Sequence, residues 1–245
     1  MNARPIGMKS IHLICSIVAA ATGALGATTI NSVNKFAYGG NIGWLSAEAD
    51  ATNGAVIGEF VCSGFIYASN AGWISLADGM PIDGVRYQNN SAGDFGVNHD
   101  GRGNLQGLAY GANIGWIRFE TNGAARVDLK TGRFSGSAWS ANCGWISLSN
   151  AFAHVQTRFL QPSVDSDGDG IPDAWELTYT NSLTVFTAST DTDGDGTADV
   201  NEFLADTDPL DANDHLRITL FATMFGDGSE TNTLTWTSRE SRCYR

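Results

Sequence analysis

One motif occurs four times between residues 30 and 150: an aromatic residue, two variable residues, Asn, one variable residue, Gly, Trp, then Ile or Leu. Its tryptophans are Trp44, Trp73, Trp116 and Trp145, spaced by 29, 43 and 29 residues. A repeat at regular spacing builds one structural unit several times, and each unit buries its apolar face against its neighbours. The spacing predicts a duplicated two-copy unit with 14 additional residues in the middle.

Each copy predicts a β-hairpin, because a tight Asn/Gly turn separates two short strand-like runs. Successive side chains of a strand point to opposite faces. In the second copy, Ile74 and Leu76 therefore share one face and form the expected core, whereas Trp73 and Ser75 share the other. We expect a mainly β fold with an all-β repeat domain of four hairpin-like Trp repeats over residues 28–160; a sandwich, a barrel and a solenoid are all open.

Columns upstream of the motif support this alignment. Four apolar residues fall five positions before the first aromatic: Val33, Cys62, Leu105 and Phe134. Three glycines share a column at which a neighbouring backbone could approach closely: Gly64, Gly107 and Gly136. Cys143 also replaces a hydrophobic residue of its column, so small buried thiols are favoured over a disulfide for both cysteines.

The Trp face has two open interpretations. The pattern favours a second buried layer, formed between sheets or stacked repeats. The alternative is a carbohydrate-binding face on which Trp44, Trp73, Trp116 and Trp145 stack on sugar rings. Four asparagines would then be polar partners: Asn41, Asn70, Asn113 and Asn142. A role within their own turns is favoured for them, because Asn tolerates left-handed backbone and caps turns.

These repeats resemble Gly-Trp-Ile-rich repeats of secreted bacterial proteins. The resemblance covers about half of the chain, is descriptive, and implies no activity.

Two twelve-residue segments, 165–176 and 191–202, have the spacing of calcium-binding loops, with Gly at position 6. Alternate oxygen-bearing residues of a curled loop converge on one point, and Ca²⁺ takes six to eight oxygens. The expected ligands are Asp165, Asp167, Asp169, Ile171 (carbonyl), Asp173 (through water) and Glu176. Those of the second loop are Asp191, Asp193, Asp195, Thr197 (carbonyl), Asp199 (through water) and Glu202.

The charge distribution agrees with metal binding. Residues 165–214 hold 14 acidic residues and no Lys or Arg, whereas the rest of the chain after residue 27 balances 12 against 12. The acidic balance argues against a nucleic-acid partner. Each loop carries five carboxylates, so one Ca²⁺ would leave about −3. The loops contain no His or Cys, which disfavours Zn²⁺, and Mg²⁺ is the second choice.

Short helices are expected after the loops, at 173–179 and 199–205, while Pro162 argues against a helix entering the first loop. Residues 165–214 resemble the thrombospondin type 3 and EF-hand-like bacterial calcium-binding repeats. The resemblance implies about two bound calcium ions in a module at 161–214. Dockerin modules, which dock onto a protein partner, also use two such loops, but Ala174-Trp175 and Val200-Asn201 lack the hydroxyl pair typical of them.

The two ends of the chain carry further expectations. Residues 1–27 combine Arg4 and Lys9, a short apolar run and the small residues at 24–27, which predicts an export signal and a secreted or cell-surface location. Alternation in 215–245 predicts the opening strands of a further β segment, partial in this chain. No apolar run after residue 27 is long enough to span a membrane.

Catalytic motifs such as a nucleophile elbow, a phosphate loop or His-Glu-x-x-His do not occur. The pair His99-Asp100 lies in a Gly/Asn-rich turn and is expected to be solvated. We therefore expect a non-enzymatic, calcium-binding structural or adhesion protein, with a cell-surface glycan or a protein as the alternative partner.

Overall fold

The computed structural model describes residues 28–50, 52–226 and 229–236. The expected export signal at 1–27 lies outside these residues. The fold is mainly β with two short helices, as predicted. Eight strands form a barrel: β1 (Ile30–Gly39), β2 (Gly43–Ser46), β4 (Cys62–Ala68), β5 (Gly72–Ala77), β7 (Leu105–Gly111), β8 (Gly115–Phe119), β11 (Ser137–Ser140) and β12 (Gly144–Ser147). The other strands near the barrel are β3 (Ala55–Ile57), β6 (Val97–His99), β9 (Arg126–Val127), β10 (Phe134–Ser135) and β13 (Val155–Thr157).

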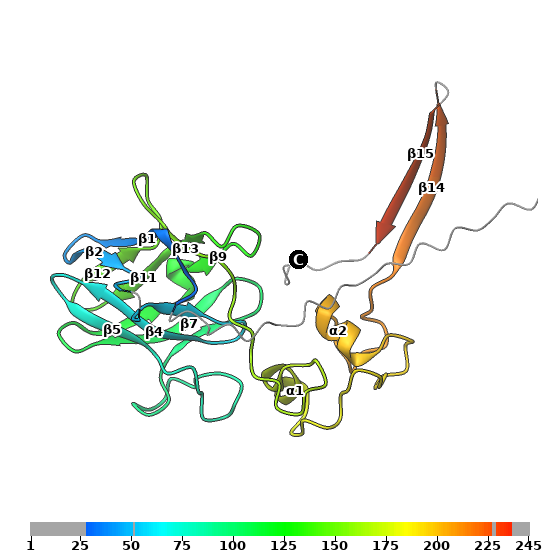
Figure 1. Cartoon of the computed structure of the whole chain (residues 1–245), viewed down its shortest axis with the longest axis horizontal. Helices are drawn as coiled ribbons and strands as arrows, with labels where there is room; N and C mark the ends of the chain where they lie inside the picture. Colours follow the sequence, from blue (N-terminus) through cyan, green and yellow to red (C-terminus); the bar gives the residue numbers. More distant parts are fainter. Residues whose placement is uncertain (1–27, 51, 227–228, 237–245) are drawn as a thin grey trace, which may run out of the picture.

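The barrel closes by pairing its first strand with its last. The strand order is β12-β11-β8-β7-β5-β4-β2-β1, and β1 pairs antiparallel with β12 through Tyr38 and Ser147 (Figure 1). Each Trp repeat supplies one antiparallel hairpin: β1–β2, β4–β5, β7–β8 and β11–β12. The predicted hairpins are confirmed, and of the three open topologies the structure is a barrel.

The alternation along each hairpin decides which side chains fill the barrel. Ile74 and Leu76 are buried, while Trp73 on the same strand faces outward and is 43% exposed. The closely packed glycines also behave as predicted. A methyl group on Gly64 would lie 2.2 Å from the Gly54 carbonyl oxygen, and the φ of +81° suits only glycine.

For one member of the apolar column, Val33, the prediction of a buried position is wrong. Val33 is 79% exposed, whereas Cys62, Leu105 and Phe134 are buried. The register of β1 shifts between Ile30 and Lys35, and the Asn31 side chain accepts hydrogen bonds from the amides of Val33 and Asn34. This local turn moves Val33 out of the core, which Ile30 occupies instead.

Four asparagine side chains tie the hairpin turns into a closed ring at one end of the barrel. The Nδ2 donors and their carbonyl acceptors are Asn41 to Cys143 (3.1 Å), Asn70 to Ile42 (3.2 Å), Asn113 to Ala71 (3.2 Å) and Asn142 to Ile114 (3.0 Å). Each turn therefore binds the turn of the neighbouring hairpin. The favoured role within their own turns is wrong, because the left-handed backbone falls on glycines such as Gly43 and Gly72.

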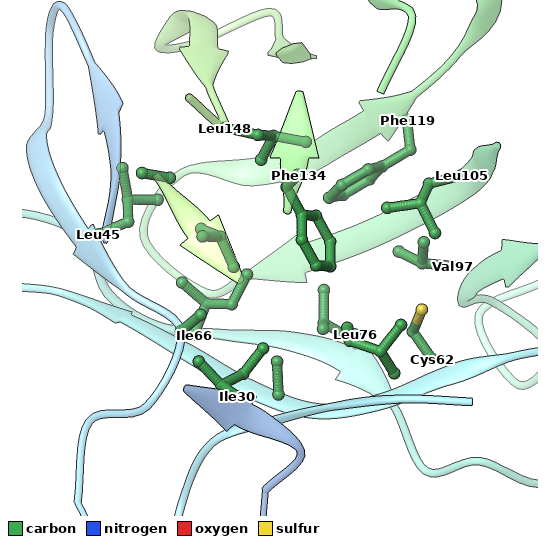
Figure 2. A pocket seen from close by; sticks show the side chains of 15 residues that line it. Ile30, Leu45, Cys62, Ile66, Leu76, Val97, Leu105, Phe119, Phe134 and Leu148 are labelled. Carbon is green, nitrogen blue, oxygen red and sulfur yellow. The ribbon is translucent and has the colours of Figure 1, made fainter. Parts of the chain in front are cut away.

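The barrel interior is apolar and almost filled. Figure 2 shows the inward side chains, among them Leu45, Leu76 and Phe134. The cavity that they line has a volume of about 30 Å³. This volume is far below the roughly 300–1,000 Å³ of a ligand pocket. Cys62 lines the same cavity, and burial raises the pKa of its thiol to about 12. Cys62 and Cys143 are buried free thiols, as predicted.

After the barrel, the chain forms α1 (Asp173–Tyr179) and α2 (Asp199–Ala205), with the predicted bounds. The expected C-terminal strands form a separate hairpin of β14 (Ile218–Gly226) and β15 (Ser229–Trp236), which points away from the barrel (Figure 1). None of the helices in the described part of the chain is long and apolar enough to cross a membrane.

Replacing Asn70 with Ala removes one bond of the ring and leaves the Ile42 carbonyl without this donor. We expect the free energy of unfolding to fall by about 1 kcal/mol, the usual contribution of such a bond. Urea denaturation followed by circular dichroism measures the change. Asn90→Ala, at an exposed position outside the ring, is the matched control. Equal midpoints for Asn70→Ala and the wild type would contradict a stabilising ring.

Candidate metal site

In each Asp-rich loop, the first three aspartates converge. Carboxylate oxygens of Asp165, Asp167 and Asp169 all lie within 4.8 Å of one another, and the same holds for the trio Asp191, Asp193 and Asp195. The local sequence explains the curl of the first loop. Gly168 and Gly170 adopt positive φ, and their amides donate to the two Asp165 oxygens over 2.8 and 3.0 Å. Gly194 and Gly196 repeat this arrangement on Asp191 over 2.8 and 2.9 Å.

The helices that follow the loops deliver one buried glutamate each. Glu176 on α1 and Glu202 on α2 are fully buried, at 0% exposure. Both oxygens of Glu176 lack a hydrogen-bond partner, as do Oε2 of Glu202, Oδ2 of Asp169 and Oδ2 of Asp193. A buried carboxylate without a partner carries a large desolvation cost. Each loop thus presents buried, unsatisfied oxygens beside two further aspartates, which is the setting of a cation site.

The electrostatics of these groups follow from the same crowding. Burial, with the negative charges of Asp167 and Asp169 beside it, raises the pKa of Glu176 to about 7. Burial likewise raises the pKa of Glu202 to about 7, with Asp193 and Asp195 contributing. The pKa of Asp169 is raised, again chiefly by burial. The glutamates are therefore poised to lose a proton when a cation arrives.

The aspartates at position 9 of each loop brace the loop from within. Asp173 accepts hydrogen bonds from the backbone amide and the hydroxyl of Ser166, over 2.7 and 2.5 Å. Asp199 accepts from the Thr192 amide over 2.9 Å and from the Thr190 hydroxyl over 2.5 Å. Their water-mediated coordination, and the carbonyl ligands predicted at Ile171 and Thr197, stay predictions.

A small apolar cluster holds the two loops together. Ile171, Trp175, Phe186 and Phe203 are buried against one another. The Trp175 ring lies 5.3 Å from the Phe186 ring and 5.7 Å from the Phe203 ring, between ring centres. Because Trp175 precedes Glu176 and Phe203 follows Glu202, this cluster fixes both glutamates relative to each other.

Two contacts of the second loop were missed by the sequence analysis. His215 Nδ1 lies 3.0 Å from Oδ2 of Asp195, and the Thr207 hydroxyl donates to Oε1 of Glu202 over 3.2 Å. Both residues lie beyond the loop in sequence, so loop spacing carries no signal for them. Thr207 therefore satisfies one oxygen of the second glutamate, whereas both Glu176 oxygens lack a hydrogen-bond partner, as does Oδ2 of Asp195 despite the nearby His215.

The residues present fit a divalent metal ion. Two clusters of carboxylates, at 165–169 and 191–195, could each hold one, and each has a buried glutamate at its closing position. Bare carboxylate oxygens are the ligands that hard cations prefer.

The four motif tryptophans lie on the outside of the barrel. Their exposures are 48% for Trp44, 43% for Trp73, 41% for Trp116 and 50% for Trp145. The favoured interpretation of this face as a second buried layer is wrong, because the hairpins close into one barrel whose inner face alone is covered.

His99 is not the solvated residue that its Gly/Asn-rich turn suggested. It is 3% exposed, its Nδ1 lies 2.9 Å from the Glu59 carbonyl oxygen, and its Nε2 lies 3.1 Å from the Gly103 amide nitrogen. These partners favour a proton on Nδ1, and burial lowers the pKa of the ring. The ring is enclosed by backbone groups.

The chain matches no known protein family, no curated protein and no solved structure.

Without metal, the two glutamates should make stability depend on pH. Their folded-state pKa of about 7 exceeds the usual 4.5, so the folded state binds more protons between these values. Their stabilising contribution is present below about pH 4.5 and is lost as pH rises through about 7. We expect thermal unfolding in chelator to show a wild type that loses stability between pH 5 and 8 relative to Glu176→Gln/Glu202→Gln. The amides of that variant mimic protonated glutamates.

Glu120→Gln, which neutralises a barrel carboxylate, serves as the control and should keep the wild-type profile. His99 contributes equally to all three proteins, so the comparison isolates the loop glutamates. Parallel profiles for the wild type and the double variant would rule out the buried charge.

Proposed function

We propose that this protein is an exported, non-catalytic structural or adhesion protein in which two Asp-rich loops bind one Ca²⁺ each and rigidify the junction between β modules. One observation carries the proposal: Glu176 is fully buried with both oxygens unpartnered, beside three converging aspartates. Such a group is costly unless a cation neutralises it. The charged start, short apolar run and small residues of 1–27 support export. The enclosure of His99 supports a structural role for the His99-Asp100 pair.

Calcium is the favoured ion for chemical reasons. The first loop offers only oxygen ligands, and five carboxylates per loop suit a large cation with high coordination number. Mg²⁺ would require a tight octahedron and retains water ligands, which a flexible glycine-rich loop does not enforce. Extracellular calcium modules bind with dissociation constants of about 10⁻⁴–10⁻³ M, so millimolar calcium outside a cell would occupy the sites.

Calcium would act by removing repulsion. In its absence, carboxylates within 4.8 Å of one another repel, and two buried glutamates resist ionisation. In its presence, the loops, α1, α2 and the aromatic cluster become one ordered unit. The segment between the barrel and the β14–β15 hairpin would thereby change from a mobile linker to a rigid spacer.

Isothermal titration of calcium into the full chain tests the proposal. We expect about two ions per chain, and about one for Glu176→Gln or for Glu202→Gln. Losing one charge beside a cation weakens binding by more than about tenfold, given about 4 kcal/mol for a partly screened contact at 4 Å. Glu120→Gln should bind like the wild type.

The titration also has a clear negative outcome. A wild-type thermogram without heat above dilution, together with circular dichroism that is identical in calcium and in chelator, would remove the proposed function. Heat with magnesium but not with calcium would reassign the ion.

A second candidate function, carbohydrate binding, gains support from the exposure of the tryptophans. Trp44 contacts Phe36 and Tyr38 edge-on. Trp73 contacts Phe65 edge-on and Tyr67 in a tilted arrangement. In the third repeat the ring beside Trp116 and Tyr110 is Phe95, which comes from the long connection between β5 and β6, residues 78–96, where the insertion lies. Repeated aromatic groups held in place on an exposed face are typical of surfaces that stack on sugar rings.

Acrylamide quenching of tryptophan fluorescence tests this second candidate. We expect efficient quenching of the free protein and, if the face binds sugars, about twofold protection by saturating cellohexaose or chitohexaose, because a bound sugar ring covers an indole face. Trp73→Ala should weaken the protection, whereas Val33→Ala, an exposed position outside the aromatic groups, should not. Unchanged quenching with both sugars would discard this use of the face.

A dockerin-like docking role has less support. Trp175, one of the residues at the corresponding recognition position, is only 3% exposed and lies inside the cluster between the helices.

A further inference from the structure

The tip of the β3–β4 hairpin, residues 58–61, is where the barrel meets the loop module. The chain reverses there through a bond from the Gly58 amide to the Val61 carbonyl over 3.0 Å. The side chain of Phe60 packs against the cluster of Ile171, Trp175, Phe186 and Phe203. A residue of the barrel thus belongs to the core that fixes Glu176 and Glu202.

Buried His99 holds this tip in place. Its backbone amide donates to the Phe60 carbonyl over 2.8 Å, and its Nδ1 reaches the carbonyl oxygens of Gly58 and Glu59 over 3.1 and 2.9 Å. Strand β6 therefore clamps three consecutive residues of the tip. The barrel therefore fixes the backbone from which the Phe60 side chain projects, by bonds that do not involve the loops.

The connecting segment also runs along the tip, so no free spacer separates barrel and loops. The Gln161 amide donates to the Ile57 carbonyl over 2.7 Å, and the Glu59 amide donates to the Gln161 carbonyl over 3.2 Å. The Ser163 amide then donates to Oε2 of Glu59 over 3.1 Å. Asp165, the first loop residue, follows two positions later.

Two further close approaches link the barrel to the segments that follow the first and the second Asp-rich loop. A methyl group on Gly84, in the insertion between the second and third repeats, would lie 3.2 Å from Leu177 Cδ1 on α1. Arg102 lies 3.9 Å from Asp206, which follows α2. The barrel side therefore lies against α1 at Gly84, against the aromatic cluster at Phe60, and beside the residue that follows α2 at Arg102.

We propose that Phe60 is a positioning residue for both metal loops: the barrel completes the core on which Glu176 and Glu202 sit, and metal binding and docking onto the barrel are one coupled event. The inference rests on the proposed function, since it requires the loops to bind metal. Coupling of this kind is reciprocal, so docking onto the barrel strengthens metal binding by the same factor by which metal strengthens docking.

Calcium titration of the full chain with Phe60→Ala tests the coupling. We expect both sites to weaken by about 5- to 100-fold, the usual range for coupled sites, although Phe60 is not a ligand. Phe60→Leu, which retains most of the apolar volume, should restore most of the affinity. Phe36→Ala, which removes an aromatic ring from the outer face beside Trp44, should bind calcium like the wild type.

Hydrogen exchange on the unmutated chain gives a second readout that does not depend on a variant that folds. Calcium should slow exchange of the His99 amide, which donates to Phe60, and should not do so in Glu176→Gln/Glu202→Gln. Equal calcium affinity of Phe60→Ala and the wild type, with exchange at His99 insensitive to calcium, would overturn the coupling while leaving the proposed function intact. A wild type that binds no calcium would overturn the proposed function itself.

Discussion

Two buried, ionisable glutamates, each next in sequence to a residue of the aromatic cluster, are the constraint on which the segment after the barrel depends. Glu176 and Glu202 have no exposure to solvent, and the aspartates of each loop add negative charge beside them. Hydrophobic contacts of Trp175 and Phe203 favour the closed arrangement, whereas desolvation and repulsion of the carboxylates oppose it. A divalent ion bound at each loop, as proposed above, would reverse the sign of the electrostatic part. The same side chains would then favour order, and the fold of this segment would depend on its ligand.

The barrel obeys a different constraint, that of closing four similar hairpins into a ring. Hydrogen bonds between β1 and β12 remove the open sheet edge, and the asparagine ring repeats the closure at the level of side chains. The insertion between the second and third repeats supplies an aromatic ring that the third hairpin lacks. It places Phe95 against Trp116 where the first two repeats use a ring of their own strand, and it also carries Gly84 to α1. An added loop thus maintains the aromatic surface and contacts the loop module.

The sequence pattern correctly predicted those features that depend on residues close together in the chain. Alternation placed Ile74 and Leu76 inside, and the loop spacing located α1 and α2, because the glycine turns and the glutamate at position 12 act within a dozen residues. Contacts between distant segments were beyond the sequence. The pairing of Tyr38 with Ser147 selects a barrel over a sandwich, and the enclosure of His99 depends on carbonyl groups 40 residues away. The predicted burial of Val33 was wrong because the Asn31 side chain makes a local turn, which the spacing of apolar residues does not reveal.

The β14–β15 hairpin follows the Asp-rich loops, which in turn follow the barrel, so its placement depends on both. The β14–β15 hairpin pairs only with itself among the described residues, and an isolated two-stranded hairpin is marginally stable. Its orientation relative to the barrel depends on the loops between them, whose position depends in turn on Phe60 and on the bonds of Gln161 and Ser163 to the hairpin tip. A cation that orders the loops would therefore fix the direction in which the C-terminal strands leave the barrel, and metal occupancy would select among the relative orientations of two β elements.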